Sequence, residues 1–311
     1  MPRPRLLYRS RRLPPGRSGT LVEATPATAG WELVRFAVRR LAPDGTWRAA
    51  LDDEECCLVL LAGSCRVAVD GLGAVDLGPR ADVFGGYPHA VYAPAGSRIE
   101  VTALGGPCEL ADCRAGRAGP PGRFAPQVVR PEDCGFEIRG GGNATRQIVD
   151  ILPPSFPAAR LMICEVFTPG GNWSSYPPHK HDTERPPIEA DLEETYYYRM
   201  RDPAGYGLQR LYTADGRLDE VVTVGHGDLV LVREGYHPFV AAHGYDAYYL
   251  NVLAGRRRSM AAADDPRYAA LRRAWPPPDP RVPVVPPPPG RSDPPWARPV
   301  ETAASPAGGS P

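Results

Sequence analysis

Several features that are common in other proteins are scarce in this chain of 311 residues. It has a single lysine, no Cys-x-x-Cys pair and an odd number of cysteines, seven, which argues against a zinc ribbon or a disulfide framework and predicts reduced thiols. No stretch approaches the roughly 18 apolar residues that span a bilayer, and the basic amino end lacks the apolar run of a secretory signal. The formal net charge is zero, so composition predicts neither a nucleic-acid nor a membrane partner. We expect a cytoplasmic protein.

Long helical periodicity is also nearly absent. Instead, 33 glycines and 39 prolines separate short runs of β-branched and aromatic residues, a pattern typical of an all-β chain. Residues 20–134 and 135–262 look like a loose duplication, because each half leads into a Gly/Pro turn beside a histidine, His89 in the first and His237 in the second. Short antiparallel strands avoid exposed edges by closing into barrels, so the sequence predicts two tandem antiparallel jelly-roll barrels.

Three segments fall outside these barrels in our prediction. Residues 1–19 form a basic extension, and residues 263–275, which open with acidic residues and a proline, form a short helix. Residues 276–311 are so rich in proline that we expect them to be disordered, without a role in catalysis.

The six histidines are unevenly placed, and three of them suggest a metal site. His179 and His181 are separated by one residue, and side chains so spaced point the same way only on an extended strand. His237 follows a later strand pattern and a glycine turn. Three imidazole nitrogens and one carboxylate oxygen would suit one divalent ion per chain, either Zn, Mn, Fe, Co or Ni.

Two adjacent glutamates compete to be the carboxylate ligand. Residues 182–193 are polar and contain two consecutive prolines, which predicts a loop, and a strand resumes after it. On that strand Glu194 shares a face with Tyr196 and Tyr198, whereas Glu193 lies on the opposite face. We favour Glu194 because the same aromatic alternation accompanies the ligand glutamate of related proteins, and Glu193 remains the alternative.

The order of these features resembles the two motifs of the cupin barrel. More specifically, residues 165–182, 192–199 and 234–238 closely resemble the 5-deoxy-glucuronate isomerase family of bacterial myo-inositol catabolism, and the likeness covers about residues 20–275. In a typical cupin the glutamate follows the second histidine after three or four residues. The longer insert here departs from that pattern and favours this family over the sister 4-deoxy-uronate ketol isomerases of pectin breakdown.

The resemblance implies a bicupin with a metal ion in the second barrel. His89 lacks a second histidine and a carboxylate at metal spacing, so we expect no ion in the first barrel. The resemblance also implies a small sugar acid as substrate, with conversion of 5-deoxy-glucuronate to 5-dehydro-2-deoxy-gluconate. Such an aldose–ketose isomerisation moves a carbonyl from C1 to C2 through an enediolate that a divalent ion stabilises. It also needs a general base and a general acid. The candidates are a hydroxide on the ion and four side chains, Lys180, Glu193, Tyr196 and Tyr198, although strand alternation would aim Lys180 away from an ion held by its neighbours.

The substrate carboxylate calls for an arginine, since a guanidinium can bind it through two hydrogen bonds. Of Arg160, Arg199 and Arg210, which accompany second-barrel strands, we favour Arg160 and Arg210. Gln209 and Asn251 could orient substrate hydroxyl groups.

Two other function classes remain open. Three histidines and one glutamate in a cupin can also hold Fe(II) for a dioxygenase, which oxygen uptake would reveal. A non-catalytic sugar-binding bicupin has no need of an open metal position. A homodimer is compatible with paired barrels.

Overall fold

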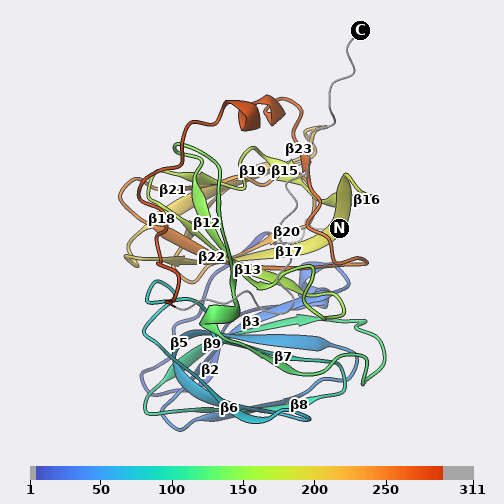
Figure 1. Ribbon diagram of the computed structural model, residues 1–311, viewed down its shortest axis with the longest axis vertical. Coiled ribbons are helices and arrows are strands. Elements are labelled where there is room, and N and C mark those ends of the chain that lie inside the picture. Colours follow the sequence, from blue (N-terminus) through green and yellow to red (C-terminus); the bar gives the residue numbers. More distant parts are fainter. Residues whose placement is uncertain (1–4, 290–311) are drawn as a thin grey trace.

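The computed structural model describes residues 5–289, which form two barrels stacked along the long axis of the molecule (Figure 1). The strands of the first barrel are β2 (Gly19–Ala24), β3 (Val34–Leu41), β4 (Thr46–Ala50), β5 (Glu55–Val69), β6 (Gly73–Arg80), β7 (Ala90–Ala93), β8 (Arg98–Ala103), β9 (Cys108–Ala115) and β10 (Gln127–Val129). Those of the second are β11 (Gly135–Arg139), β12 (Arg146–Leu152), β13 (Met162–Thr168), β14 (Trp173–Ser174), β15 (His179–Lys180), β16 (Asp182–Arg185), β17 (Glu189–Met200), β18 (Tyr206–Tyr212), β19 (Asp219–Gly225), β20 (Leu229–Val232), β21 (Phe239–Ala241) and β22 (Ala247–Gly255).

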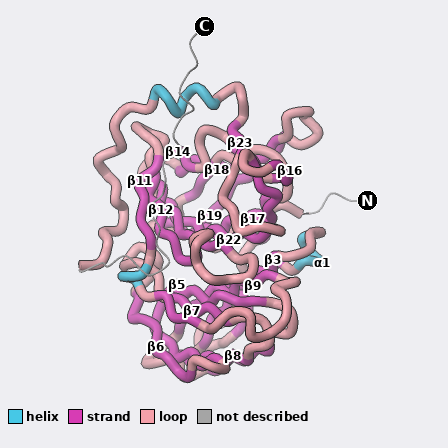
Figure 2. Tube along the Cα trace, turned by 45° about the vertical axis from the view of Figure 1, so that its right-hand side comes forward, coloured by secondary structure: helices cyan, strands magenta, loops and turns pink. Residues whose placement is uncertain are grey.

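The remaining elements are short. They are β1 (Leu7–Tyr8), β23 (Ala263–Asp264), α1 (Pro26–Ala29) and two 3-10 turns, η1 (Pro131–Asp133) and η2 (Ala269–Ala274). Within the described part of the chain, no helix has the length and apolar character that crossing a bilayer requires. The tube view shows strands throughout both barrels, which confirms the all-β prediction (Figure 2).

The two barrels share a core. In one sheet the strands run in the order β10-β7-β5-β9-β3-β2, and in the other β1-β20-β17-β22-β13-β12-β11. One face of each sheet packs into a common cluster between the barrels, whereas the opposite faces fill the separate interiors of the two barrels. On β17, for example, Tyr197 enters the shared core while Tyr196 and Tyr198 point into the second barrel. Strands buried on both faces explain the nearly continuous apolar runs of the sequence.

Two carboxylates, the buried Glu55 and the half-buried Glu193, connect the barrels in a matching way. Glu55 of the first barrel accepts hydrogen bonds of 2.6–2.7 Å from three consecutive backbone N–H groups, those of residues 159–161. Glu193 of the second barrel accepts three from residues 32–34, at 2.6, 2.9 and 2.8 Å. Each barrel therefore holds the start of a strand in the other, as expected of a duplicated unit.

This contact predicts a structural role for Glu193. Replacing Glu193 by Ala leaves three N–H groups without their acceptor and should lower the free energy of unfolding by about 2–4 kcal/mol, measured by urea denaturation. Glu100, an exposed partner of Arg48, offers a control whose replacement by Ala should change stability by less than about 1 kcal/mol. Equal stabilities for the two variants would show that the Glu193 contact does not hold the barrels together.

The amino-terminal segment belongs to the second barrel. Leu7 and Tyr8 pair with Val230 and Leu229, so β1 extends the second barrel's sheet although it precedes the first barrel in sequence. The strand lies within the basic extension predicted over residues 1–19, where no strand was expected, because the edge of β20 provides hydrogen-bond partners that a local pattern cannot reveal.

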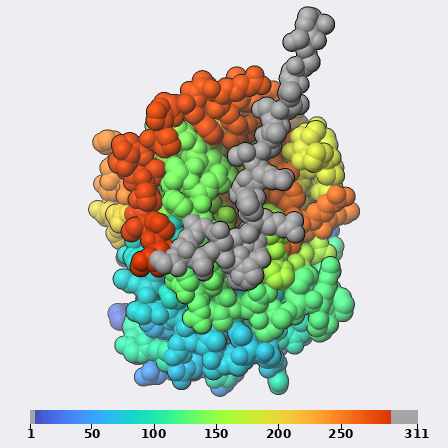
Figure 3. Space-filling model, viewed as in Figure 1, coloured from blue at the N-terminus to red at the C-terminus, as the bar shows by residue number. Residues whose placement is uncertain are grey.

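The carboxy-terminal segment, residues 263–289, wraps around the second barrel (Figure 3). Of the helix predicted over 263–275, only η2 forms, and β23 pairs with β15 instead. The prediction of disorder from residue 276 onward is wrong for residues 276–289. Val285 is 1% exposed and lies in the shared core, where its N–H donates to Gln147 Oε1 at 3.0 Å and its C=O accepts from Gln147 Nε2 at 2.7 Å. The prediction for residues 290–311 lies outside the described residues.

Candidate metal centre

Four side chains converge at one end of the second barrel's interior. His179 lies on β15, His181 follows it, Glu194 lies on β17, and His237 follows the turn between β20 and β21. That turn needs Gly235, whose φ is +83° and where a Cβ would stand 2.4 Å from the carbonyl oxygen of Tyr212. The turn therefore aims His237 inward only with glycine at this position.

The ligand atoms are close together and buried. Glu194 Oε2 lies 2.9 Å from His181 Nε2 and 3.3 Å from His237 Nε2. One ligand atom from each of these three residues lies within 4.8 Å of the others. The ring of His179 has its centroid 4.9 Å from that of His237 and 6.4 Å from that of His181.

This arrangement fits a divalent cation. His237 Nε2 is buried without a hydrogen-bond partner, so it has a lone pair available in the direction of Glu194. Burial lowers the pKa of His237 to about 3 and also lowers the pKa of His179, which keeps both imidazoles in the neutral form that binds metals. Burial alone would lower the pKa of His181, but the charge of Glu194 raises it.

The glutamate that faces the histidines is Glu194, whereas Glu193 faces the other barrel as described above. The predicted loop over 182–193 is instead a β-hairpin, because β16 pairs with an early start of β17 at Asp182–Asp191 and Arg185–Glu189. The hairpin lengthens β17 to 12 residues and delivers Glu194 to the barrel interior.

Neighbouring groups orient the ligands. Asn251 Nδ2 donates to Glu194 Oε1 at 2.6 Å, so the other carboxylate oxygen is the one that faces the histidines. The Nδ1 of His237 lies 3.0 Å from the carbonyl oxygen of Gly235, which leaves Nε2 as the ligand atom. Asn251, predicted to touch substrate, therefore contacts a metal ligand.

The Asn251 contact can be tested directly. Replacing Asn251 by Ala frees Glu194 to rotate and should weaken binding of a divalent ion by roughly 10–100-fold, measured by competition with a fluorescent chelator. Asn172→Ala is the matched control, since that buried amide binds Thr145 and Asp279 instead. Equal affinities in both variants would contradict the orienting role of Asn251.

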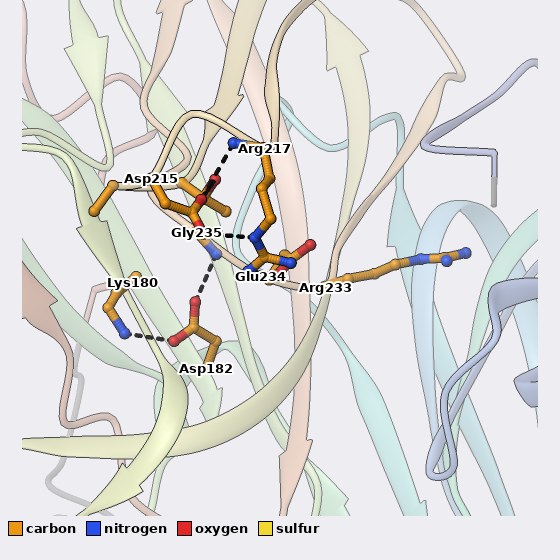
Figure 4. A pocket seen from close by; sticks show the side chains of 9 residues that line it. Lys180, Asp182, Asp215, Arg217, Arg233, Glu234 and Gly235 are labelled. Atoms are coloured by element: carbon orange, nitrogen blue, oxygen red, sulfur yellow. Dashed lines mark hydrogen bonds and ion pairs between the residues drawn. The ribbon is translucent and has the colours of Figure 1, made fainter. Parts of the chain in front are cut away.

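Lys180 lies outside the barrel. Its ammonium binds Asp182, and it also donates to Glu189 at 2.6 Å. Asp182 in turn accepts from the Gly235 N–H at 2.7 Å. Lys180, Asp182 and Gly235 line part of a polar surface pocket (Figure 4). The structure does not bring Lys180 to the ligands, in agreement with strand alternation.

The two tyrosines predicted on β17 point into the barrel. Tyr196 has its ring centroid 5.9 Å from that of His237, and its hydroxyl lies 2.9 Å from Ser175 Oγ. Tyr198 lies deeper and donates to Gln209 at 2.9 Å. Gln209 Nε2 lies 3.5 Å from the carbonyl oxygen of His237, so this amide contacts the protein backbone.

The arginines favoured for the substrate carboxylate lie elsewhere. Arg160 donates to the carbonyl oxygens of Arg117 and Gly255, and Arg210 forms a partly exposed ion pair with Asp219 at 2.7 Å. Arg199 binds Glu109. Sequence reasoning missed Arg146, which is 3% exposed at the start of β12. Its only sequence signal is a charge two residues before the inward-facing Ile148.

Two stacked antiparallel barrels, with three imidazoles and one carboxylate gathered inside the second, define a bicupin with a candidate metal centre. The sequence profile of the KduI/IolB family matches residues 6–271, and the chain belongs to this family.

Its relatives carry a consistent name. A protein of Geobacillus kaustophilus named 5-deoxy-glucuronate isomerase is 46% identical over 253 residues, which are 81% of this chain and 90% of the relative. A protein of the same name from Bacillus subtilis strain 168 is 37% identical over 250 residues, 79% of this chain and 90% of the relative.

Solved structures agree on the fold. The crystal structure of an IolB-like protein from Salmonella typhimurium LT2 has a TM-score of 0.80 and 36% identity, and covers 86% of this chain and 99% of its own. A Lactobacillus farciminis oxalate decarboxylase in complex with formate has a TM-score of 0.60 over 84% of this chain and 88% of its own. At 13% identity, this second likeness supports the bicupin fold alone.

Proposed function

We propose that the protein is an isomerase that converts 5-deoxy-glucuronate to 5-dehydro-2-deoxy-gluconate inside the second barrel. The observation that carries this proposal is the buried cluster of His181, Glu194 and His237 in a chain that is 46% identical to a named 5-deoxy-glucuronate isomerase. His179 completes the donor set. The relatives' name also favours this reaction over that of the pectin-pathway isomerases, in agreement with the family resemblance.

Three nitrogen donors and one oxygen donor favour Zn, Mn, Fe, Co or Ni over Mg or Ca, which prefer oxygen ligands alone. A divalent ion bound there would act as a Lewis acid on the carbonyl and hydroxyl oxygens at C1 and C2. Asn251 orients Glu194 and the carbonyl oxygen of Gly235 orients His237, so neighbouring groups hold these two donors in place.

Tyr196 is our candidate for proton transfer. Among the four side chains predicted for this role, it is the one whose ring lies beside a metal ligand, His237. Burial, followed by the nearby charge of Glu194, raises the pKa of Tyr196 well above its ordinary value, so its hydroxyl stays protonated. We infer that this hydroxyl donates a proton or a hydrogen bond to the substrate while Ser175 orients it.

Replacing Tyr196 by Phe tests this role. The variant should retain the divalent ion, while kcat should fall by about 100-fold because the proton donor is lost. Tyr236→Phe is the control, because Tyr236 packs against Tyr212 at the barrel rim. A Tyr196→Phe enzyme with wild-type kcat would remove Tyr196 from the mechanism.

The reaction itself is testable by proton NMR in D2O. Purified protein loaded with a divalent ion should convert the aldehyde signal of 5-deoxy-glucuronate into a keto acid under anaerobic conditions, and a chelator should stop the reaction. Unchanged substrate with a fully loaded protein would refute the proposal. A requirement for oxygen would favour the dioxygenase instead.

A further inference from the structure

Arg146 is a buried cation without a protein counter-charge. Of the three buried arginines in the described chain, Arg80 pairs with Glu165 and Arg114 pairs with Asp112, each with at least one contact of 2.8 Å or shorter. Arg146 pairs with no carboxylate of residues 5–289. Burial is the largest cause that lowers its pKa, to about 10, and the charge of Arg139 adds to it. A buried charge without a counter-charge lowers the stability of the fold unless a ligand supplies the opposite charge.

One edge of the guanidinium remains available. Nη1 donates to the carbonyl oxygens of Ala144 and Tyr176 at 3.1 and 3.0 Å, which fixes the plane of the group. In the described structure no hydrogen bond leaves Nε or Nη2. These two atoms form the side of an arginine that binds a carboxylate through two parallel hydrogen bonds.

Arg146 lies beside the metal centre. It shares the inward face of β12 with Ile148, which packs in the interior of the second barrel. Arg146 donates to the carbonyl oxygen of Tyr176. The carbonyl oxygen of the next residue, Pro177, lies 3.4 Å from Nδ1 of His179. Two consecutive carbonyl oxygens therefore connect Arg146 with a metal ligand.

The neighbouring charged residues do not neutralise the positive charge of Arg146. Arg139 binds Glu137 at 2.9 and 2.7 Å, and Arg272 of η2 binds Asp264. Each of these pairs is neutral, so an anion that enters the barrel next to His179 meets one uncompensated positive charge.

We propose that Arg146 binds the carboxylate of the sugar-acid substrate and that this contact selects acids over neutral sugars. The inference rests on the proposed isomerase function. It replaces the earlier expectation for Arg160 and Arg210. Arg146 would hold the C6 end while the reacting C1 and C2 lie at the metal ligands.

The test compares two substrates, 5-deoxy-glucuronate and its analogue in which a hydroxymethyl group replaces the carboxylate. Arg146→Met should lower kcat/KM for the acid by roughly 100-fold, mainly through KM, and change that for the neutral analogue less than about threefold. The content of bound metal, measured by mass spectrometry, should stay at the wild-type value. Arg139→Met is the control, since that guanidinium already has a carboxylate, and it should preserve the ratio between the two substrates.

An equal loss for both substrates, or a loss of metal, would overturn the proposal, because Arg146 would then only support the turn that carries His179. If Arg146→Met does not fold, Arg146→Lys replaces it: the charge is kept without the planar fork, so preference for the acid should fall by about tenfold, and an unchanged preference would overturn the proposal. A metal-loaded wild-type protein that is inactive on 5-deoxy-glucuronate would instead reject the isomerase function itself.

Discussion

Replacing His181 by Ala should remove the divalent ion and reduce kcat/KM for 5-deoxy-glucuronate by about 1,000-fold or more. His181 Nε2 faces the same carboxylate oxygen as His237 does, so its loss opens one side of the donor set. An ion held by two imidazoles and one carboxylate binds more weakly, and the Lewis-acid contribution of several kcal/mol disappears with it.

Metal content and NMR turnover measure the two effects in the same samples. His243→Ala is the matched control, because His243 is exposed on a loop and should lose neither metal nor activity. A His181→Ala protein that keeps its ion and its turnover would show that the buried cluster is not the metal centre.

Replacing Arg80 by Met should cause the largest loss of stability, about 3–5 kcal/mol, because it leaves the Glu165 carboxylate buried without a cation. Arg80 binds both oxygens of Glu165 at 2.8 Å, and both side chains are at most 1% exposed. Tyr248 also donates to Glu165, at 2.9 Å. The pair joins β6 of the first barrel to β13 of the second.

Urea denaturation of Arg80→Met, Glu165→Gln and the double variant isolates the coupling between the two residues. The double variant should recover part of the loss, since neither charge then remains unpaired. Arg66→Met, which breaks an exposed pair with Asp76, should cost less than about 1 kcal/mol. An Arg80→Met protein as stable as Arg66→Met would contradict the structural role of the buried pair.

The side chains that gather at the candidate metal centre were the most predictable part of the site. His179 and His181 obey the period of an extended strand, and Glu194 was separated from Glu193 by the same alternation. Such patterns depend on a few neighbouring residues, so they can be recognised in the amino-acid sequence alone. The insert before Glu194 was harder to predict, because whether residues 182–193 form a loop or a hairpin depends on pairing with β17.

The substrate side was poorly predictable. In a chain where 36 cationic residues include one lysine, arginine identity carries almost no information about function. Arg146 is more buried than Arg160 and Arg210, and unlike Arg210 it has no carboxylate partner; both properties arise from contacts between distant segments. Glu193, a plausible base by its position in sequence, turns out to bind the first barrel.

By itself the sequence determined the all-β class, the duplication and the residues that gather at the candidate metal centre, because strand alternation and turn-forming glycines act over a few residues. Tertiary structure alone decided that the segment around Leu7 joins the second barrel, that Val285 enters the shared core, that Lys180 binds Asp182 and Glu189, and that Arg146 lacks a counter-charge. Those outcomes depend on which groups meet across the fold and on how much water is excluded there, and neither is encoded in local spacing.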